Sequence, residues 1–447
     1  MLTMETLRRE VAEGAIDTVL ACMIDMQGRL MGKRFTARHF IDHAWAETHC
    51  CDYLLATDLE METPSGYAAA SWDKGYGDYT MHPDLSTLRP VPWLPGTALV
   101  LCDVLDHDGA APIAHAPRAV LRRQIARAEA MGFAPVAATE LEFFLFADSH
   151  EDIRASGFRD LQPISGYNED YHIFQTTKEE RILRPLRNHL LAMGIPVEGT
   201  KGEAEAGQAE LNIRHADALS CADHHSLAKH ATKEIAWSEG HAASFMAKWD
   251  ADRVGSASHI HLSLIRGGKP AFAAEQGLSP VMQQFLAGQL DHAAEIMVFL
   301  APYVNSYKRF AAGTFAPTRA LWSRDNRTAG FRVIGDGSPG ARIECRIPGA
   351  DVNPYLALAA LLAAGLSGIE GKLALPDESS GNLYDRDTGA LPLTLPAATE
   401  ALRSSDMLRA AMGDAVVDHY TRAAEWEQEQ FNRAVTDYEI ARGFERS

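Results

Sequence analysis

The chain has few cysteines, no long apolar segment and a shortage of basic residues. Its six cysteines show no CxxC spacing, which argues against a disulfide framework and a structural zinc site. The longest apolar stretch, Tyr355 to Leu366, is much shorter than a bilayer span. The 42 basic residues face 60 acidic ones, so the formal charge is −18, which disfavours nucleic acid and anionic membranes as partners. Because Met1–Glu10 lacks the apolar core of a leader, we expect a cytoplasmic protein with reduced thiols.

What is present is an ordinary globular composition, with 46% hydrophobic and 23% charged residues. A length of 447 residues suggests two or three domains. A chain of this size buries enough surface to fold without a disulfide or a metal. We therefore expect that any bound metal serves chemistry rather than folding.

The N-terminal part is predicted to form a helix, a hairpin and a long loop. Met4–Ala12 has the pattern of a short amphipathic helix, and two extended runs, Ile16–Ile24 and Arg29–Phe35, flank a turn. Thr48–Pro95 is rich in Gly, Pro, Tyr and Trp and has little periodicity, which predicts a long ordered loop. Ala98–Val104 then reads as a buried strand.

A linker separates this part from the rest of the chain. Asp106–Arg118 carries Gly, Pro and Asp, and Pro117 is well placed to open a helix that reaches Met131. We place the domain boundary there and predict an N-terminal domain, 1–112, and a catalytic domain, 113–447, of mixed α and β structure. The predicted helices beyond Met131 are Glu179–Met193, Asp217–Gly240, Pro280–Leu300, Pro354–Gly368 and Ala398–Phe431.

Four strand-like stretches of the second part carry a charged or polar face. Side chains alternate along a strand, so two glutamates of Thr139–Phe146 share one face while apolar residues take the other. A further pair of glutamates flanks the flexible Gly207. The residues on the four faces are Glu140 and Glu142; Glu203 and Glu210; His259, His261 and Ser263; and Arg342, Glu344 and Arg346.

Any one of these strands alone is adequately explained as an outer strand with a solvated face. Four of them together, with strongly apolar flanks, favour strands whose polar faces converge inside the domain. Buried carboxylates without compensation are costly, so convergence calls for divalent cations. Carboxylate oxygens with one imidazole suit Mg²⁺ or Mn²⁺ better than Zn²⁺.

A second cluster is basic. Arg309, Arg327, Arg332 and Arg346 end or flank apolar runs, which is typical of arginines that bind carboxylate and phosphate groups in a bidentate manner. Acidic metal ligands combined with arginines suit phosphoryl transfer. The chain contains no GxxxxGK[ST] motif and no GxGxxG before a helix, which disfavours a P-loop or kinase-type nucleotide site.

Several of these motifs together resemble the glutamine synthetase family in order and approximate spacing, over nearly the whole chain. They are Asp25-x-x-Gly28-Arg29-x-x-Gly32-Lys33, Glu140-Leu-Glu-Phe-Phe, Lys201-Gly-Glu, Gly207-Gln-Ala-Glu210, Gly255-Ser-Ala-Ser-His259-Ile-His261, Asn305-Ser-Tyr-Lys-Arg309, Asn326-Arg327 and Arg342-Ile-Glu-Cys-Arg346.

The resemblance implies a role for each matching position. Glu142, Glu203 and Glu210 match the ligands of a first metal near the substrate carboxylate, and Glu140, His259 and Glu344 match those of a second metal at the nucleotide phosphates. Gly255, Arg309, Arg327 and Arg346 match positions that bind glutamate and its phosphorylated side chain, the three arginines being catalytic. Glu198, His261, Ser263 and Arg332 match ATP-contacting positions.

The resemblance also implies an architecture and a reaction. We expect an α+β protein with a β-grasp-like N-terminal domain, and a catalytic domain whose partly open antiparallel barrel is surrounded by helices. The family suggests a homododecamer of two stacked hexamers with active sites at subunit interfaces. ATP would phosphorylate the γ-carboxylate of L-glutamate, and an amine would displace phosphate from γ-glutamyl phosphate, with Mg²⁺ or Mn²⁺ bound at two or more sites per subunit.

The amine pocket departs from ammonia-using members of the family. The loop that supplies an aspartate for ammonium aligns with Ser65-Gly-Tyr-Ala, and the flap glutamate is replaced by Phe315 in Gly-Thr-Phe-Ala-Pro. Tyr171 matches a tyrosine that lines this pocket. Losing two carboxylates around a small cation weakens ammonium binding, and an aromatic flap residue favours a bulkier amine.

The pattern therefore resembles the glutamate-amine ligase branch of the family, which includes γ-glutamylpolyamine, γ-glutamylethanolamide and γ-glutamylmethylamide synthetases. The sequence leaves the amine open among alkylamines, ethanolamine and polyamines. The first alternative is a true glutamine synthetase that uses ammonia through a rearranged site. The second is a catalytically silent structural or regulatory relative, which the complete metal-ligand set disfavours.

Overall fold

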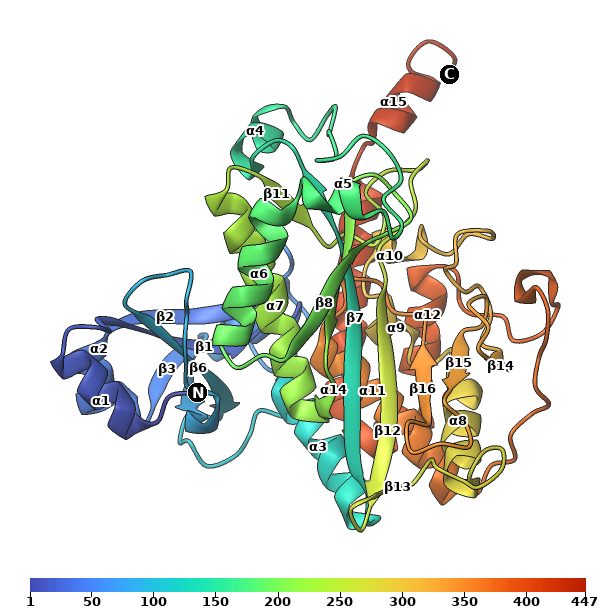
Figure 1. The fold of residues 1–447 in the computed structure, drawn as a ribbon, viewed down its shortest axis with the longest axis horizontal. Coiled ribbons are helices and arrows are strands. Elements are labelled where there is room, and N and C mark those ends of the chain that lie inside the picture. Colours follow the sequence, from blue (N-terminus) through green and yellow to red (C-terminus); the bar gives the residue numbers. More distant parts are fainter.

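The computed structural model describes residues 1–447 and contains two β-sheets, each covered by helices (Figure 1). The first sheet belongs to the N-terminal part and has the order β2-β1-β6-β4-β3, with β5 paired to β6. β1 and β6 run parallel, and the other pairs are antiparallel. The expected helix and hairpin are confirmed. The elements are α1 (Met4–Ala12), β1 (Thr18–Ile24), β2 (Leu30–Thr36), α2 (Ala37–His39), β3 (Thr48–Cys51), β4 (Asp78–Pro83), β5 (Arg89–Pro90) and β6 (Thr97–Leu105).

The long loop predicted over Thr48–Pro95 is partly wrong, because three strands of the first sheet lie within it. β3 pairs with β4, and β4 and β5 pair with β6. These strands are two to six residues long, too short to display a clear period of two in the sequence. Pairing with neighbouring strands, rather than local pattern, holds them in place. The irregular segment that remains is 52–77.

The second sheet has ten strands, in the order β14-β15-β16-β12-β7-β9-β8, with β10 and β11 on β7 and β13 on β12. It curls into a partly open barrel, because its end strands β14 and β8 do not pair with each other. The expected antiparallel pattern has one exception, since β14 and β15 run parallel. The strands are β7 (Ala134–Phe146), β8 (Val197–Gly202), β9 (Gln208–Ile213), β10 (Ala216–Asp217), β11 (Ala242–Ser244), β12 (Ser258–Arg266), β13 (Lys269–Pro270), β14 (Trp322–Arg324), β15 (Phe331–Ile334) and β16 (Arg342–Cys345).

Helices surround this sheet (Figure 1). α11, which has more buried residues than any other helix, includes the longest apolar run of the chain. None of the helices combines the length and the apolar character that crossing a membrane requires. The helices are α3 (Pro117–Ala130), α4 (His150–Ala155), α5 (Ile173–Thr177), α6 (Glu180–Ala192), α7 (Ala218–Ser238), α8 (Pro280–Asp291), α9 (Met297–Leu300), α10 (Val304–Tyr307), α11 (Pro354–Glu370), α12 (Leu395–Arg403), α13 (Asp406–Met412), α14 (Asp414–Arg433) and α15 (Asp437–Gly443).

Two predicted helices are divided. The block expected over Pro280–Leu300 is α8 followed by α9, and the block expected over Ala398–Phe431 is α12, α13 and α14. Local chemistry explains the second division. The Ser405 hydroxyl caps the start of α13, and Gly413, at a φ of +91°, separates α13 from α14. A left-handed glycine at this position is a common helix terminator.

The two faces of β1 belong to two different cores. Val19, Ala21 and Met23 are buried among residues of the N-terminal part, whereas Leu20 and Cys22 belong to the large core of the barrel part. This is the period of two expected of a strand that is buried on both faces. The N-terminal sheet is therefore packed against the barrel part rather than tethered to it.

Polar contacts add to this packing. The turn between β1 and β2 lies on the start of α11, where Asn353 Nδ2 donates to the carbonyls of Asp25 and Met26 at 3.1 Å each. Gly28 has a φ of +82°, and a Cβ there would lie 3.2 Å from the Asn353 Cα. Glycine thus serves both the left-handed turn and the close approach. The buried Arg118 of α3 also joins the two parts through Asp84, Asp103 and Asp223.

Candidate active site

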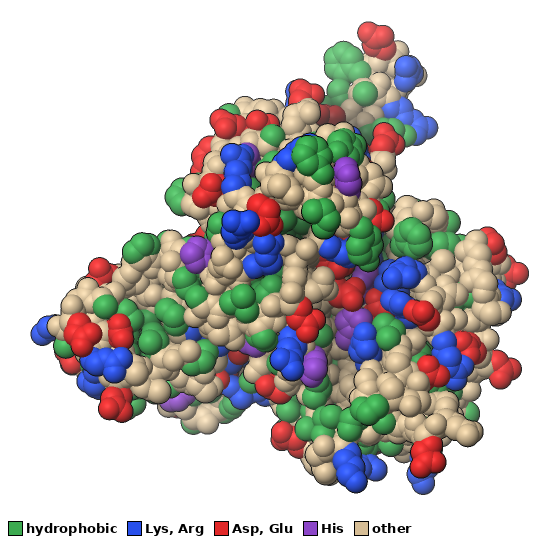
Figure 2. Space-filling model, in the orientation of Figure 1, with side chains coloured by type: hydrophobic (Ala, Val, Ile, Leu, Met, Phe, Trp, Pro, Cys, Tyr) green, Lys and Arg blue, Asp and Glu red, His purple; other side chains and the backbone are tan.

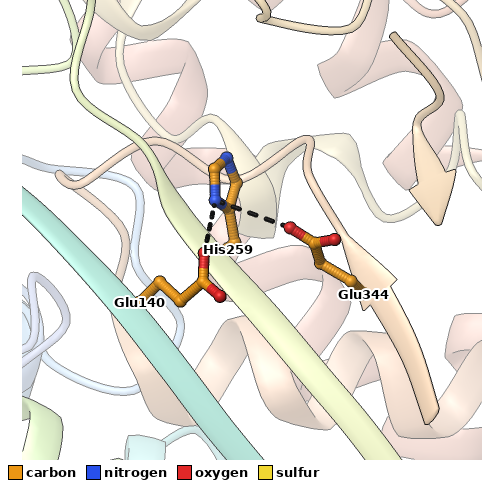
Figure 3. A group of neighbouring side chains, drawn as sticks. All are labelled: Glu140, His259 and Glu344. Atoms are coloured by element: carbon orange, nitrogen blue, oxygen red, sulfur yellow. Dashed lines mark hydrogen bonds and ion pairs between the residues drawn. The ribbon is translucent and has the colours of Figure 1, made fainter. Parts of the chain in front are cut away.

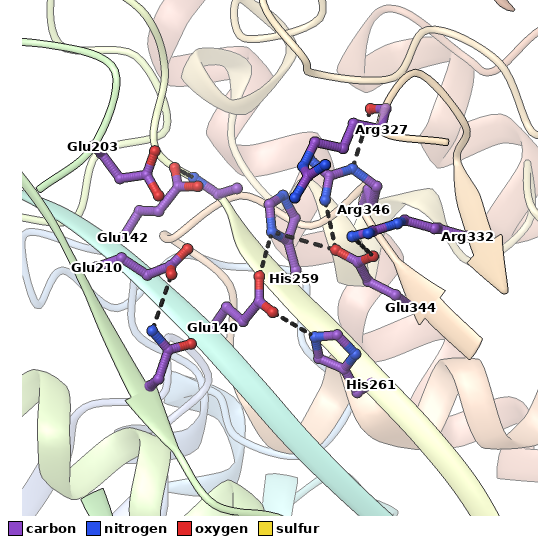
Figure 4. Close-up of polar contacts among 12 residues, drawn as sticks. Glu140, Glu142, Glu203, Glu210, His259, His261, Arg327, Arg332, Glu344 and Arg346 are labelled. Carbon is purple, nitrogen blue, oxygen red and sulfur yellow. Dashed lines mark hydrogen bonds and ion pairs between the residues drawn. The ribbon is translucent and has the colours of Figure 1, made fainter. Parts of the chain in front are cut away.

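Adjacent strands of the barrel place acidic and histidine side chains opposite one another. Glu140 of β7 is paired in register with His259 of β12, and Glu142 of β7 is paired with Glu210 of β9. Glu140 and Glu142 are two residues apart, so both pairs lie on one face of the sheet. Figure 2 shows a hollow in which acidic, basic and histidine side chains lie close together, and Figure 4 shows these groups pointing toward one another. Strand register therefore produces the convergence that alternation along single strands predicts.

The first cluster of possible metal ligands is Glu140, His259 and Glu344 (Figure 3). His259 Nδ1 lies 3.0 Å from Glu140 Oε2 and 3.6 Å from Glu344 Oε1, and one donor atom from each residue lies within 4.8 Å of the others. Burial and the positive charge of Arg346 lower the pKa of His259. A neutral imidazole is the form that coordinates a metal.

The carboxyl groups of this cluster are ionised. Burial alone would raise the pKa of Glu140, but hydrogen bonds from His259 and His261 outweigh it and hold that pKa well below the ordinary value. For Glu344, burial is likewise outweighed by the charges of His259 and Arg346, so its pKa is lowered too. The cluster therefore offers two carboxylates and one imidazole at neutral pH.

The second cluster contains acidic groups that lack sufficient counter-charge. Donor atoms of Glu142, Glu210 and His259 lie within 4.8 Å of one another. Burial, followed by repulsion from Glu203, raises the pKa of Glu142 to about 8 and that of Glu210 to about 8. Glu203 itself forms an ion pair with Lys201, whose ammonium is 3.9 Å from Glu210 Oε1.

These carboxylates fit a divalent cation. Buried acids that repel one another are stabilised when a cation is bound between them. The donors are carboxylate oxygens and one imidazole, with no thiolate, which suits Mg²⁺ or Mn²⁺. The residues that the sequence predicts as ligands of two metals are brought together in this way, with Glu203 at the edge of the second cluster and His259 between the two clusters.

Figure 4 shows three of the four predicted arginines, Arg327, Arg332 and Arg346, beside these acids. Arg346 Nη1 donates to Glu344 Oε1 at 2.5 Å, and Arg332 Nη1 donates to Glu344 Oε2 at 3.1 Å. The buried Arg309 donates to the carbonyls of Ile347 and Arg346 at 2.7 and 3.0 Å. Arg327 is exposed, and its carbonyl accepts a hydrogen bond from Arg346 Nε at 3.2 Å.

Gly255 stands where two close neighbours leave no room for a side chain. A Cβ at this position would lie 2.5 Å from the Ala247 carbonyl oxygen and 2.7 Å from Arg309 Cγ. Its carbonyl accepts a hydrogen bond from Gln208 Nε2 at 3.1 Å. Gly255 thus lies beside Arg309. The resemblance implies that both residues bind glutamate.

A cavity of about 480 Å³ opens beside the first cluster. Three of the four residues predicted to contact ATP line it, namely Glu198 of β8 and His261 and Ser263 of β12. Glu140 of the first cluster also lines it. The cavity therefore reaches the residues that are predicted to bind the metal at the nucleotide phosphates. The fourth residue, Arg332, does not line the cavity and is instead paired with Glu344 and Asp325.

The three residues predicted for the amine pocket lie in irregular segments. Tyr171 and Phe315 are exposed and have φ values of 57° and 56°. The Lys201 ammonium lies 4.7 Å from the centroid of the Tyr171 ring, which places Tyr171 beside the Glu203 ion pair. The Ser65 carbonyl accepts from Arg422 Nε of α14 at 2.9 Å, and no hydrogen bond within the chain joins Ser65 to Tyr171 or Phe315.

Four further residues at the site are absent from the predicted set. Gln208 and Asn212 bracket Glu210 on the same face of β9, and the Asn212 amide donates to Glu210 Oε1 at 3.0 Å. The alternation of side chains along β9 that identifies Glu210 also identifies Gln208 and Asn212. Lys201 and Tyr384 carry no such signal. Burial raises the pKa of Tyr384, and the charges of Arg346 and Arg309 oppose that rise.

Acidic and histidine donors inside a barrel, flanked by arginines and a nucleotide-sized cavity, are those of a metal-dependent enzyme that handles phosphate and carboxylate groups. Comparison with known proteins identifies the family. Residues 114–443 match the model of the glutamine synthetase catalytic domain. The chain therefore belongs to the glutamine synthetase family.

Several relatives are similar over the full length. A gamma-glutamylethanolamide synthetase of Streptomyces coelicolor is 47% identical over 447 residues, covering 100% of this chain and 96% of the relative. A glutamate–isopropylamine ligase of a Pseudomonas species is 38% identical, covering 96% and 95%. A solved structure described as apo GmaS without ligand superimposes with a TM-score of 0.85 at 27% identity over 100% of both chains. These comparisons confirm the predicted fold class.

Proposed function

We propose that this chain is an ATP-dependent ligase that joins the γ-carboxylate of L-glutamate to an amine through γ-glutamyl phosphate, releasing ADP and phosphate. The observation that carries the proposal is full-length similarity to two relatives named for amine ligation, in a chain whose flap presents Phe315 where ammonia-using members have a carboxylate. Ethanolamine, named for the relative with the higher identity, and isopropylamine have the same number of non-hydrogen atoms. We therefore propose an amine of about that size.

The first half-reaction transfers a phosphoryl group. A γ-carboxylate oxygen of glutamate attacks the γ-phosphorus of ATP, and the bond to the ADP oxygen breaks. Bound divalent metals supply charge neutralisation for the phosphates. Glu142, Glu203 and Glu210 would hold one metal, and Glu140, His259 and Glu344 the other.

The arginines complete the charge balance. Arg346 is buried beside Glu344, and we assign it to the transferring phosphoryl group, where a guanidinium offsets negative charge without needing to lose a proton. Arg309 lies beside Gly255, and we assign both to glutamate. Arg327, which is exposed, is free to close on the acyl phosphate. The adenosine part of ATP would lie in the cavity lined by Glu198, His261 and Ser263, with Arg332 contacting a phosphate.

In the second half-reaction, the amine nitrogen attacks the γ-carbon, the bond to phosphate breaks, and the nitrogen loses a proton. Two features favour an organic amine over ammonium. Phe315 removes the flap carboxylate, and Ser65 stands at the other carboxylate position.

The test is ADP release by the purified protein with ATP, Mg²⁺ and L-glutamate, with ammonium, methylamine, ethanolamine, isopropylamine, putrescine and spermidine compared by kcat/KM. Ethanolamine or a similar monoamine should be preferred. Preference for ammonium would instead establish a true glutamine synthetase. Absence of turnover with every amine, in protein that binds ATP, would identify a catalytically silent relative. Replacing Mg²⁺ by Mn²⁺ in the same assay decides which metal the site prefers.

We also propose the dodecamer of two stacked hexamers and the domain division 1–112 and 113–447. α15 extends away from the body of the chain (Figure 1) and exposes Tyr438, Ile440 and Phe444. Exposed apolar side chains on a projecting helix are suited to contact another subunit. Removal of residues 435–447 should shift the particle mass by sedimentation from twelve toward six subunits.

ATP as a substrate favours the cytoplasm as the site of the reaction.

A further inference from the structure

Residues 165–172, a segment that we call the clasp, lie directly on the turn between β8 and β9. This turn, 202–207, includes Glu203 and leads to Glu210. The clasp therefore contacts the backbone that carries two of the proposed ligands of the first metal. Three hydrogen bonds, besides the one that Glu169 accepts, join the two segments. Asn168 Nδ2 donates to the Ala204 carbonyl at 3.0 Å, the Tyr171 N–H donates to the Gly202 carbonyl at 3.4 Å, and the Gly207 N–H donates to Ser165 Oγ at 2.6 Å.

Glu169 is the buried centre of the clasp. It is fully excluded from solvent, and its Oε1 accepts the Gly207 N–H at 2.5 Å and a short hydrogen bond from the Ser165 hydroxyl. Its carbonyl oxygen would lie 2.7 Å from a Cβ at Gly202. Gly207 has a φ of +73°. Glu169 therefore touches both ends of the turn, and each end requires glycine.

A second buried acid lies behind Glu169. Neither oxygen of the Glu179 carboxyl has a hydrogen-bond partner, and neither does Glu169 Oε2. Burial, followed by the negative charge of Glu169, raises the pKa of Glu179 to about 9, and Lys178 opposes that rise. Glu179 therefore keeps its proton at neutral pH, so that it adds no second negative charge beside Glu169.

We propose that Glu169, supported by the Glu179 carboxyl, is a positioning residue that aligns the first-metal carboxylates and the amine-pocket residue Tyr171 at the same time. This inference rests on the proposed function. The turn held by Glu169 bears Glu203 at one end and leads to Glu210 at the other, and Tyr171 follows Glu169 by two residues in the same clasp. Neither Glu169 nor Glu179 touches substrate in this assignment.

The test measures metal binding and amine use separately. Loss of a partner that orients metal ligands typically weakens metal affinity about 10–100-fold. Glu169→Ala should therefore raise the Kd for Mn²⁺, measured by EPR of the free ion, by about 10-fold or more, and should raise the amine KM by a similar factor. The KM for ATP should change less than about 2-fold, because the nucleotide cavity lies beside the cluster of Glu140, His259 and Glu344.

Two substitutions serve as matched controls. Glu169→Gln keeps an oxygen that accepts from Gly207 and should restore most of the Mn²⁺ affinity. Asp170→Asn removes an exposed charge from the same clasp and should change neither constant. If Glu169→Ala does not fold by circular dichroism, Ser165→Ala should weaken both constants in the same direction, by a smaller factor. Unchanged Mn²⁺ affinity and amine KM in a folded Glu169→Ala or Ser165→Ala variant would overturn the proposal.

The metal-free protein provides an independent readout. Glu179→Gln mimics the protonated acid, so its Tm should fall less than that of the wild type between pH 5 and 9, where the unfolded but not the folded Glu179 is ionised. An identical pH dependence in both proteins would contradict a Glu179 carboxyl that stays protonated in the folded state. Mn²⁺ binding and Tm do not depend on amine turnover. If the clasp substitutions change Mn²⁺ affinity and Tm but the protein has no ligase activity, the proposed function is wrong and the positioning role of Glu169 still stands.

Discussion

Restoring a carboxylate at the flap should raise the efficiency with which the protein uses ammonium. Phe315→Glu places an acid where ammonia-using relatives have one, and its backbone, at a φ of 56°, is no less favourable for Glu than for Phe. Two opposite charges 4 Å apart attract by about 4 kcal/mol at a dielectric constant of 20 and by about 1 kcal/mol in water. Phe315 is 57% exposed, so screening reduces the gain to about 1–2 kcal/mol.

That gain corresponds to a rise of about 10-fold in kcat/KM for ammonium. The assay is ADP release at saturating ATP and glutamate, with ammonium varied. Phe315→Gln is the matched control, because it has the shape of Glu without the charge and should leave kcat/KM for ammonium within about 2-fold of its value in the wild type. Equal kcat/KM for ammonium in Phe315→Glu and Phe315→Gln would show that the flap side chain does not contact the amine.

Three further predictions concern metal, pH and stability. Glu142→Gln should reduce kcat by more than about 100-fold while the metal-free protein becomes more stable, and loss of activity without a gain in Tm would contradict the charge argument. Since burial and repulsion raise the pKa of Glu142 and Glu210 to about 8, the unfolded state loses these protons first as pH rises. The Tm in EDTA should therefore fall between about pH 5 and 8, and added Mg²⁺ should raise it more at pH 8 than at pH 6. Arg118→Met leaves the buried Asp223 without its guanidinium and should cost about 3–5 kcal/mol in urea unfolding; a cost below 1 kcal/mol would show that the pair contributes little.

Strand periodicity accounts for most of the site that the sequence could predict. Glu140 and Glu142, or His259 and His261, share a face because alternation is a local property of any strand. Which strands lie side by side is not local, and the pairing of Glu142 with Glu210 follows from the sheet order. The resemblance to a family supplied that order in advance. The residues alone predicted that the polar faces of the strands converge. They did not predict which strands pair with each other.

The remaining features depend on contacts that leave little trace in a single sequence. β3 and β5 exist because a neighbouring strand offers hydrogen bonds, and four or two residues are too few for a pattern. The ion pair of Lys201 with Glu203 depends on the turn that joins β8 to β9. Glu169 lies in a segment with no periodicity, and Glu179 lies at the start of a predicted helix, where acids are common. Only their burial distinguishes them from exposed acids.

The proposed metal ligands and the proposed amine-pocket residues occupy different kinds of backbone. Most of the former lie on strands that are hydrogen-bonded on both sides, where a shift of one residue would turn every donor to the opposite face. Tyr171 and Phe315 lie in irregular segments, where substitutions and small insertions are better tolerated. Descendants of one ancestral gene could thus acquire new amines by altering loops while inheriting the phosphate chemistry unchanged. The same division gives protein engineers a short list of positions to randomise when a different γ-glutamylamide is wanted.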